Sequence, residues 1–158
     1  MVWVATTSPV APVTLANPQT PDPVYGYGRV EAAPAGAPVR ARFTLSHVTY
    51  VGSHEGCGCG FNSGDLAWEG FERVDEVRPL IDAMSDEERA KFLAAQGSRE
   101  RLRAIVEGAL TAGPVEVFGC WAGDEVDAAV GCEDVAPAHF TERTEPIGER
   151  VLYRVSPR

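Results

Sequence analysis

Hydrophobic and polar residues alternate in three stretches of the chain, and each stretch predicts a β-strand. Residues 39–45 read VRARFTL, in which every second residue is apolar, at the period of a strand with one buried face. Beyond this stretch the apolar positions change phase to Val48 and Tyr50, which predicts a bulge or burial on both faces. The stretches 115–121 and 151–155 alternate in the same way. The sequence therefore predicts strands both before and after the middle of the chain.

The middle of the chain has helical periodicity and helix-capping residues. Ser85 followed by Glu88 has the form of a capping box, in which the serine oxygen and the glutamate carboxylate satisfy free amides at a helix start. We expect a helix from there to about Gln96, and a second, continuing piece that Ser98 caps after a glycine. Apolar residues at helical spacing extend this piece to residue 110, before Gly113 and a proline end it.

This order of elements predicts an α+β fold, in which a largely antiparallel sheet carries a helical hairpin or a broken helix on one face. An alternative adds a helix over residues 74–84, whose first turn would contain Pro79. Residues 1–38 hold most of the prolines and many alanines, and we expect them to form irregular structure and edge strands packed on the domain. We expect residues 1–158 to form a single domain.

Length and charge limit what this domain can do. A chain of 158 residues that is 44% hydrophobic buries about 70% of its unfolded surface, so it needs no disulfide or metal merely to fold. Its formal net charge is −9 and Lys91 is its only lysine, which opposes binding to nucleic acid or to an anionic membrane. It has no apolar run long enough to span a bilayer, and its proline-interrupted start does not resemble a secretory signal. We expect a cytoplasmic protein with reduced thiols.

The stretch GSHEGCGCGF, residues 52–61, concentrates residues that can do chemistry. If it stays extended, Cys57 and Cys59 share one face of a strand and their sulfurs lie about 6–7 Å apart before rotamers are chosen. That separation suits joint binding of zinc after a small pucker. It equally suits plain packing, because a face made only of glycine lets another backbone or a helix approach closely.

All four cysteines follow a glycine, at positions 57, 59, 120 and 132, but their spacings do not match zinc knuckles. A site composed from separate segments would join Cys57, Cys59 and Cys120 with either His54 or Cys132. Our predicted metal site is Cys57, Cys59, Cys120 and His54, with zinc as its cofactor. The competing interpretation is that the cysteines are buried and structural, since free cysteine is among the most buried residue types.

Two further groups of residues could contribute to function. The acidic residues in WAGDEVDAA, residues 121–129, match no calcium-binding loop, and we expect a solvated turn. Trp68, Phe71 and Trp121 either belong to the core or form an aromatic surface for a partner.

Two hypotheses from different classes follow. In the first, the Gly-Cys-Gly-Cys-Gly segment and Cys120 form a thiol or zinc site on the α+β scaffold. In the second, the protein is a non-enzymatic acidic binding module whose charge attracts a basic protein, and its cysteines are structural. The sequence names no reaction, so it leaves open whether the protein is an enzyme.

Overall fold

The computed structural model describes residues 1–12, 29–54, 59–62 and 71–157, with only the backbone of Cys59. These residues form one six-stranded sheet in the order β2-β3-β1-β4-β6-β5. The strands are β1 (Val2–Thr6), β2 (Val30–Ala32), β3 (His47–Val51), β4 (Val115–Gly119), β5 (Gly131–Val135) and β6 (Val151–Val155). All neighbouring pairs are antiparallel except β5 and β6. The predicted α+β class with a largely antiparallel sheet is confirmed.

The expectation of irregular structure and edge strands over residues 1–38 is wrong for β1, which lies in the middle of the sheet between β3 and β4. All five residues of β1 are buried. A strand buried on both faces is apolar throughout and shows no alternation, so the period of two could not reveal it. β2 is an edge strand as expected, and residues 13–28 lie outside the described residues.

The strand predicted over residues 39–45 is also wrong, because this stretch begins with the 3-10 helix η1 (Pro38–Arg42). The Arg40 guanidinium ties the two ends of the segment together, donating to the carbonyls of Ala33, Pro34 and Ser46. Val39 alone of these helical residues is buried. These local bonds compete with strand pairing, so the alternation extends into a strand only at β3.

Helix α2 (Asp86–Leu110) is a single helix, and the break predicted after Gln96 does not occur. Its capping box is confirmed, since Ser85 Oγ accepts from the Glu88 amide at 3.3 Å while the Glu88 carboxylate accepts from the Ser85 amide at 2.9 Å. Ser98 does not cap a new piece but donates its hydroxyl to the Ala94 carbonyl within the helix. A single glycine lowers helix stability by about 1 kcal/mol, which packing along a long helix outweighs.

The alternative helix over residues 74–84 is present as α1 (Val74–Val77) followed by the 3-10 helix η3 (Arg78–Ala83). Val74 and Val77 form a small core with Phe92 of α2. The remaining short elements had no recognised signal in the sequence: η2 (Cys59–Phe61), η4 (Asp124–Val126), α3 (His139–Glu142) and strand β5.

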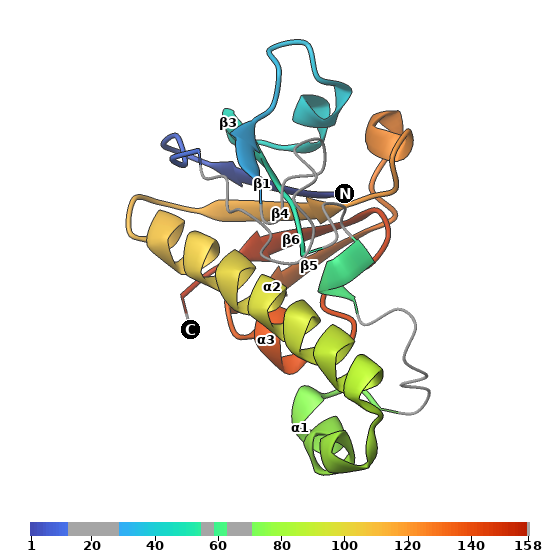
Figure 1. Ribbon diagram of the computed structural model, residues 1–158. Helices are drawn as coiled ribbons and strands as arrows, with labels where there is room; N and C mark the ends of the chain where they lie inside the picture. The colour runs from blue at the N-terminus through green and yellow to red at the C-terminus, as the bar shows by residue number, and fades with distance from the viewer. Residues whose placement is uncertain (13–28, 55–58, 63–70, 158) are drawn as a thin grey trace.

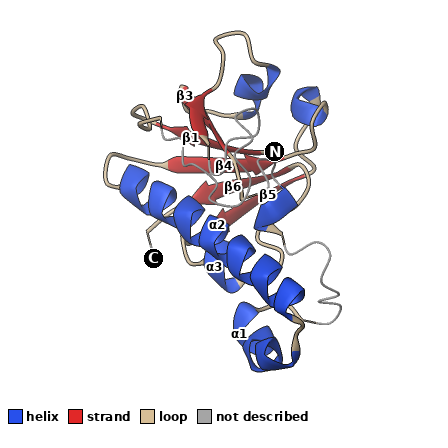
Figure 2. Ribbon diagram, in the orientation of Figure 1, coloured by secondary structure: helices blue, strands red, loops and turns tan. Residues whose placement is uncertain are grey.

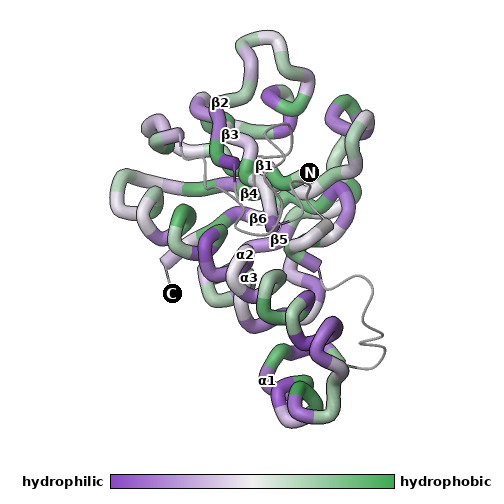
Figure 3. The backbone as a smooth tube through the Cα atoms, viewed as in Figure 1, coloured by the Kyte–Doolittle hydropathy of each residue, from purple (hydrophilic) through white to green (hydrophobic). Residues whose placement is uncertain are grey.

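The sheet separates two hydrophobic cores. α2 lies across one face (Figures 1 and 2), where Leu102 and Val106 pack in one cluster with Val2 and Val4 of β1. Figure 3 shows hydrophobic and hydrophilic residues recurring along α2, as expected for a helix with one buried side. The second core includes Trp3 and lies on the opposite face. Because successive side chains of a strand point to opposite faces, each side chain packs in one core or in the other.

Candidate functional site

β3 and β4 both finish on the same side of the sheet, at the edge that is formed by strand ends and not by an edge strand. Both strands pair antiparallel with β1, and Val51 and Gly119 both lie opposite Val2. Two strand spacings therefore separate Val51 from Gly119, which is about 10 Å between their Cα atoms. The Gly-Cys stretch that follows β3 and the Cys120 segment that follows β4 leave the sheet at this edge. β6 begins at this edge too, since Leu152 lies opposite Phe118.

His54 lies just beyond β3 on the side of the sheet that α2 covers. Its amide donates to Ser98 Oγ at 2.9 Å, and its Nδ1 lies 3.2 Å from the same oxygen. The glycine run does not stay extended to its end, because Cys59 begins η2. Gly60 lies against the imidazole, so closely that a Cβ there would be 2.7 Å from His54 Cε1. Cys57 and the side chain of Cys59 lie outside the described residues, so their convergence with Cys120 stays a prediction.

Cys120 faces the opposite side of the sheet from His54, packed in the core that contains Trp3 and Phe118. It is 5% exposed, and burial raises the pKa of its thiol, which keeps the thiol protonated at neutral pH. Cys132 is exposed on β5, and both thiols are free. Within the described residues, no three His, Cys, Asp or Glu side chains are grouped so that they could hold a metal ion.

An open cavity of about 280 Å³ lies at this edge of the sheet. It brings together the segment after the Gly-Cys stretch and the segment after β4, because Asn62 and Cys120 both line it. Trp121, 56% exposed, presents an aromatic surface at the cavity. Exposed Glu145 and Glu149 supply two carboxylates. The remaining lining residues are Met1, Gly119, Ile147 and Gly148.

One wall of this cavity belongs to the loop of residues 143–150, which joins α3 to β6 and is bonded to several elements. Asn62 pairs with the backbone of Ile147 in both directions, donating from Nδ2 to the carbonyl at 2.7 Å and accepting the amide at Oδ1 at 3.2 Å. Pro146 presents its carbonyl 2.9 Å from His139 Nε2. These bonds fix backbone groups that a surface loop would otherwise leave to water.

Two titratable side chains support the middle of the loop: Tyr153 is buried and His139 is partly buried. The Tyr153 hydroxyl accepts the Gly148 amide at 2.7 Å. The His139 ring lies 5.1 Å from the Tyr153 ring, centre to centre. Burial lowers the pKa of His139 and raises that of Tyr153, so both are neutral at pH 7. A neutral His139 with its proton on Nε2 donates to the Pro146 carbonyl.

Arg99 of α2 supports the N-terminal half of the loop. Its side chain is fully buried, and its guanidinium donates to the carbonyls of Phe61 at 2.5 Å, Arg143 at 3.2 Å and Thr144 at 2.6 Å. Burial lowers the pKa of Arg99 to about 10, while Glu145 favours the charged form, so the group stays a cation at neutral pH. One side chain thus connects α2, η2 and the loop beside the cavity.

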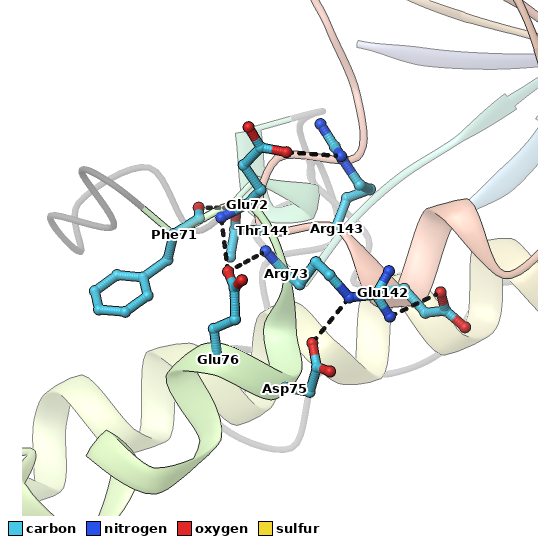
Figure 4. Close-up of polar contacts among 8 residues, drawn as sticks. All are labelled: Phe71, Glu72, Arg73, Asp75, Glu76, Glu142, Arg143 and Thr144. Atoms are coloured by element: carbon cyan, nitrogen blue, oxygen red, sulfur yellow. Dashed lines mark hydrogen bonds and ion pairs between the residues drawn. The ribbon is translucent and has the colours of Figure 1, made fainter.

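A polar network joins the same loop to the segment that precedes α1 (Figure 4). Thr144 donates its hydroxyl to the Phe71 carbonyl at 2.8 Å and its amide to the Glu72 carbonyl at 3.1 Å. Ion pairs of 3.3 Å link Arg143 to Glu72 and Arg73 to Glu142 on either side of this contact. Exposed ion pairs of this kind contribute little stability, so we assign the docking chiefly to the threonine bonds.

The sequence identified part of this site and missed the rest. Trp121 was a candidate aromatic surface, and it and Phe71 are exposed, whereas Trp68 lies outside the described residues. The predicted acidic turn contains η4, and Asp127, which directly follows η4, forms an ion pair of 3.0 Å with Arg150. No regular spacing in the sequence relates the four residues that support the loop, Asn62, Arg99, His139 and Tyr153. Arg99 alone had a local signal, because it is a charged residue within an apolar helical pattern.

No helix within the described residues is both long and apolar enough to cross a bilayer. The chain matches no protein-family model, no curated protein and no solved structure.

Proposed function

We propose that the protein is a non-enzymatic binding module that takes a basic segment of a partner protein into the cavity at the edge of its sheet. The observation behind this proposal is that hydrogen bonds from several elements hold the loop of residues 143–150 in place. Asn62, Arg99, His139 and Tyr153 come from different parts of the chain and all bond its backbone. Binding residues are commonly found on loops that a rigid scaffold positions, and a fixed loop loses little entropy when a ligand binds.

The charges at the cavity favour a cationic ligand. Glu145 and Glu149 contribute two negative charges, and the Met1 ammonium, which donates to the Cys120 carbonyl, contributes one positive charge. The groups of the lining therefore carry an excess of one negative charge, since the Arg99 cation that interacts with Glu145 is not part of the lining. The chain's net charge of −9 attracts basic partners over a longer range. The exposed indole of Trp121 is the preferred aromatic face for an arginine or lysine side chain.

The state of Cys120 favours binding over thiol chemistry at this place. The thiolate is the nucleophilic form of cysteine, and reactive cysteines lie in electropositive, partly exposed surroundings. Cys120 is buried among apolar residues, and burial raises its pKa. Burial is the largest effect on that pKa; the Met1 ammonium and a hydrogen bond with Trp3 lower the pKa, and the carboxylates of Glu125 and Asp124 raise it further.

The proposal is tested by fluorescence anisotropy with a labelled arginine-rich peptide, compared with a glutamate-rich peptide of equal length. Trp121→Ala, and the double change of Glu145 and Glu149 to glutamine, should each weaken binding by about tenfold or more. Added salt should weaken it as well. Leu93→Ala is the matched control, because Leu93 is 57% exposed on α2 and lies outside the cavity lining. Equal binding by the wild type and Trp121→Ala, or no binding of the arginine-rich peptide, would overturn the proposal.

A thiol or zinc site on the Gly-Cys-Gly-Cys-Gly segment is the second candidate function. The contact of Gly60 with the His54 ring favours it, because this contact brings the backbone beside Cys59 to a potential zinc ligand. Cys57, Cys59 and His54 remain the proposed ligands, whereas Cys120 packs on the opposite side of the sheet from His54. Elemental analysis of protein purified without chelator tests the site. Stoichiometric zinc that Cys57→Ser removes would support it, and metal-free protein would contradict it.

A further inference from the structure

β5 is the longer of the two edge strands and, among the described residues, pairs only with β6. Its three central residues, Cys132, Glu133 and Asp134, are all exposed. The opposite edge, β2, has only three residues and leads into a proline two residues later, and shortness and proline are features that protect an edge from pairing.

The backbone of β5 has groups that point away from the sheet. The Val135 carbonyl accepts the amide of Ser156, which follows β6, at 3.1 Å. In a parallel pair the amide and carbonyl of one residue point to the same side and successive residues alternate. Gly131 and Glu133 therefore also face β6, whereas Cys132 and Asp134 point to the open side. A row of such groups is a template for another extended chain.

The approach to this edge is continuous with the cavity. Trp121, Val126 and Val130 are 56%, 59% and 65% exposed, and all lie in the segment that joins β4 to β5. Trp121 and Glu149 line the cavity. Glu149 directly precedes Arg150, whose carbonyl accepts the Val130 amide at 2.8 Å. An extended chain on β5 can therefore place apolar side chains near the valines and reach the cavity at the start of the strand.

The charges of this surface select the occupant. Arg154 lies opposite Asp134 in the register of β5 and β6, so the excess negative charge comes from Glu133 and from Glu149 at the cavity. Pairing of β5 with β5 of a second copy would bring like charges together, which is destabilising in a cross-strand pair. We propose that a partner protein binds here as an extended strand of alternating basic and apolar residues, hydrogen-bonded to the open edge of β5. This inference rests on the proposed function, which supplies the basic partner.

N-methylated peptides test strand addition without altering the protein. The probe is a peptide of about ten residues that alternates arginine with valine, a length that spans a five-residue edge with margin. Two isomers carry N-methyl groups on the odd or on the even residues, which blocks one hydrogen-bonding edge each. We expect one isomer to bind at least about tenfold more weakly than the parent and the other to bind like the parent. Equal affinities of the two isomers would overturn strand addition. If the parent binds, the proposed function survives that result, whereas absent binding of the parent contradicts both.

A pair of protein variants locates the edge. Cys132→Pro removes an amide from the open side of β5 and should reduce binding of the parent peptide at least as strongly as the blocking methyl groups. Cys132→Ala changes the side chain alone and should bind like the wild type. Equal effects of both variants would show that the side chain acts without strand pairing and would overturn the inference. A wild-type dimer that Cys132→Pro makes monomeric would assign the edge to a second copy, again overturning it.

Discussion

Replacing Arg99 by methionine tests whether the buried guanidinium holds the cavity loop in place. Methionine has about the same helix propensity as arginine and a similarly long side chain, so α2 should persist. The change removes the donors to the carbonyls of Phe61, Arg143 and Thr144. It also removes a charge from a site that is fully buried.

The size of the effect follows from two opposing contributions. A buried carbonyl left without a donor costs about 1–3 kcal/mol, so the buried Phe61 and Thr144 carbonyls cost about 4 kcal/mol at the middle of that range, and the partly buried Arg143 carbonyl adds about 1 kcal/mol. Burial lowers the pKa of Arg99 to about 10, which corresponds to about 3 kcal/mol of unfavourable desolvation that methionine avoids. The difference predicts a loss of about 2 kcal/mol of unfolding free energy, or about 4–8 °C in melting temperature for a domain of this size.

Urea denaturation followed by circular dichroism measures the loss, and hydrogen exchange at the amides of Ile147 and Gly148 reports on the loop. The control is Arg103→Met on the same helix, where the arginine forms a partly exposed ion pair of 2.8 Å with Glu107. That variant should lose about 0.5 kcal/mol. If Arg99→Met also lost less than about 1 kcal/mol at an unchanged denaturant slope, the carbonyl contacts of Arg99 would not be stabilising and the reasoning would fail.

Three further changes have expected outcomes. Gly60→Ala should cost about 1–3 kcal/mol by overpacking, because the added methyl would lie 2.7 Å from His54 Cε1 and 2.8 Å from Nδ1; an unchanged melting temperature would contradict this packing. Burial keeps the pKa of His139 in the folded protein below its unfolded value, so as pH falls below about 6.5 only the unfolded chain gains a proton and stability declines. Urea midpoints at pH 7 and pH 5 measure this decline, which His139→Phe should reduce, and parallel losses in both proteins would count against it. A thiol reagent should modify exposed Cys132 at least about tenfold faster than buried Cys120 in the native protein, as followed by peptide mass analysis; equal rates would refute the assigned environments.

Features that depend on neighbouring residues could be predicted from the sequence. The capping box at Ser85 and Glu88 is local, because its bonds join residues three positions apart. β4 and β6 were recognisable from alternation, and α1 and η3 from helical spacing. These patterns are enough to give the α+β class, since each periodicity identifies an element without reference to its partners.

The errors in the prediction arose where tertiary contacts outweighed local pattern. β1 is buried on both faces because β3 and β4 flank it in the sheet and a core covers each side. Residues 39–42 alternate like a strand, yet the bonds of Arg40 to three carbonyls hold a 3-10 helix there. The glycine at position 97 does not end α2, because packing against the sheet favours a continuous helix.

For the candidate site, the thiols and the acidic character of the chain could be read from the sequence by itself, which left Trp121 as either a core or a surface residue. Only the tertiary structure placed Cys120 and His54 on opposite sides of the sheet, because the direction of a side chain at a strand end depends on register. The cavity likewise depends on pairing between distant segments, since Asn62 meets Ile147 across 85 residues and Arg99 meets Thr144 across 45. No local pattern encodes such contacts, because they form only once the strands and α2 have packed together.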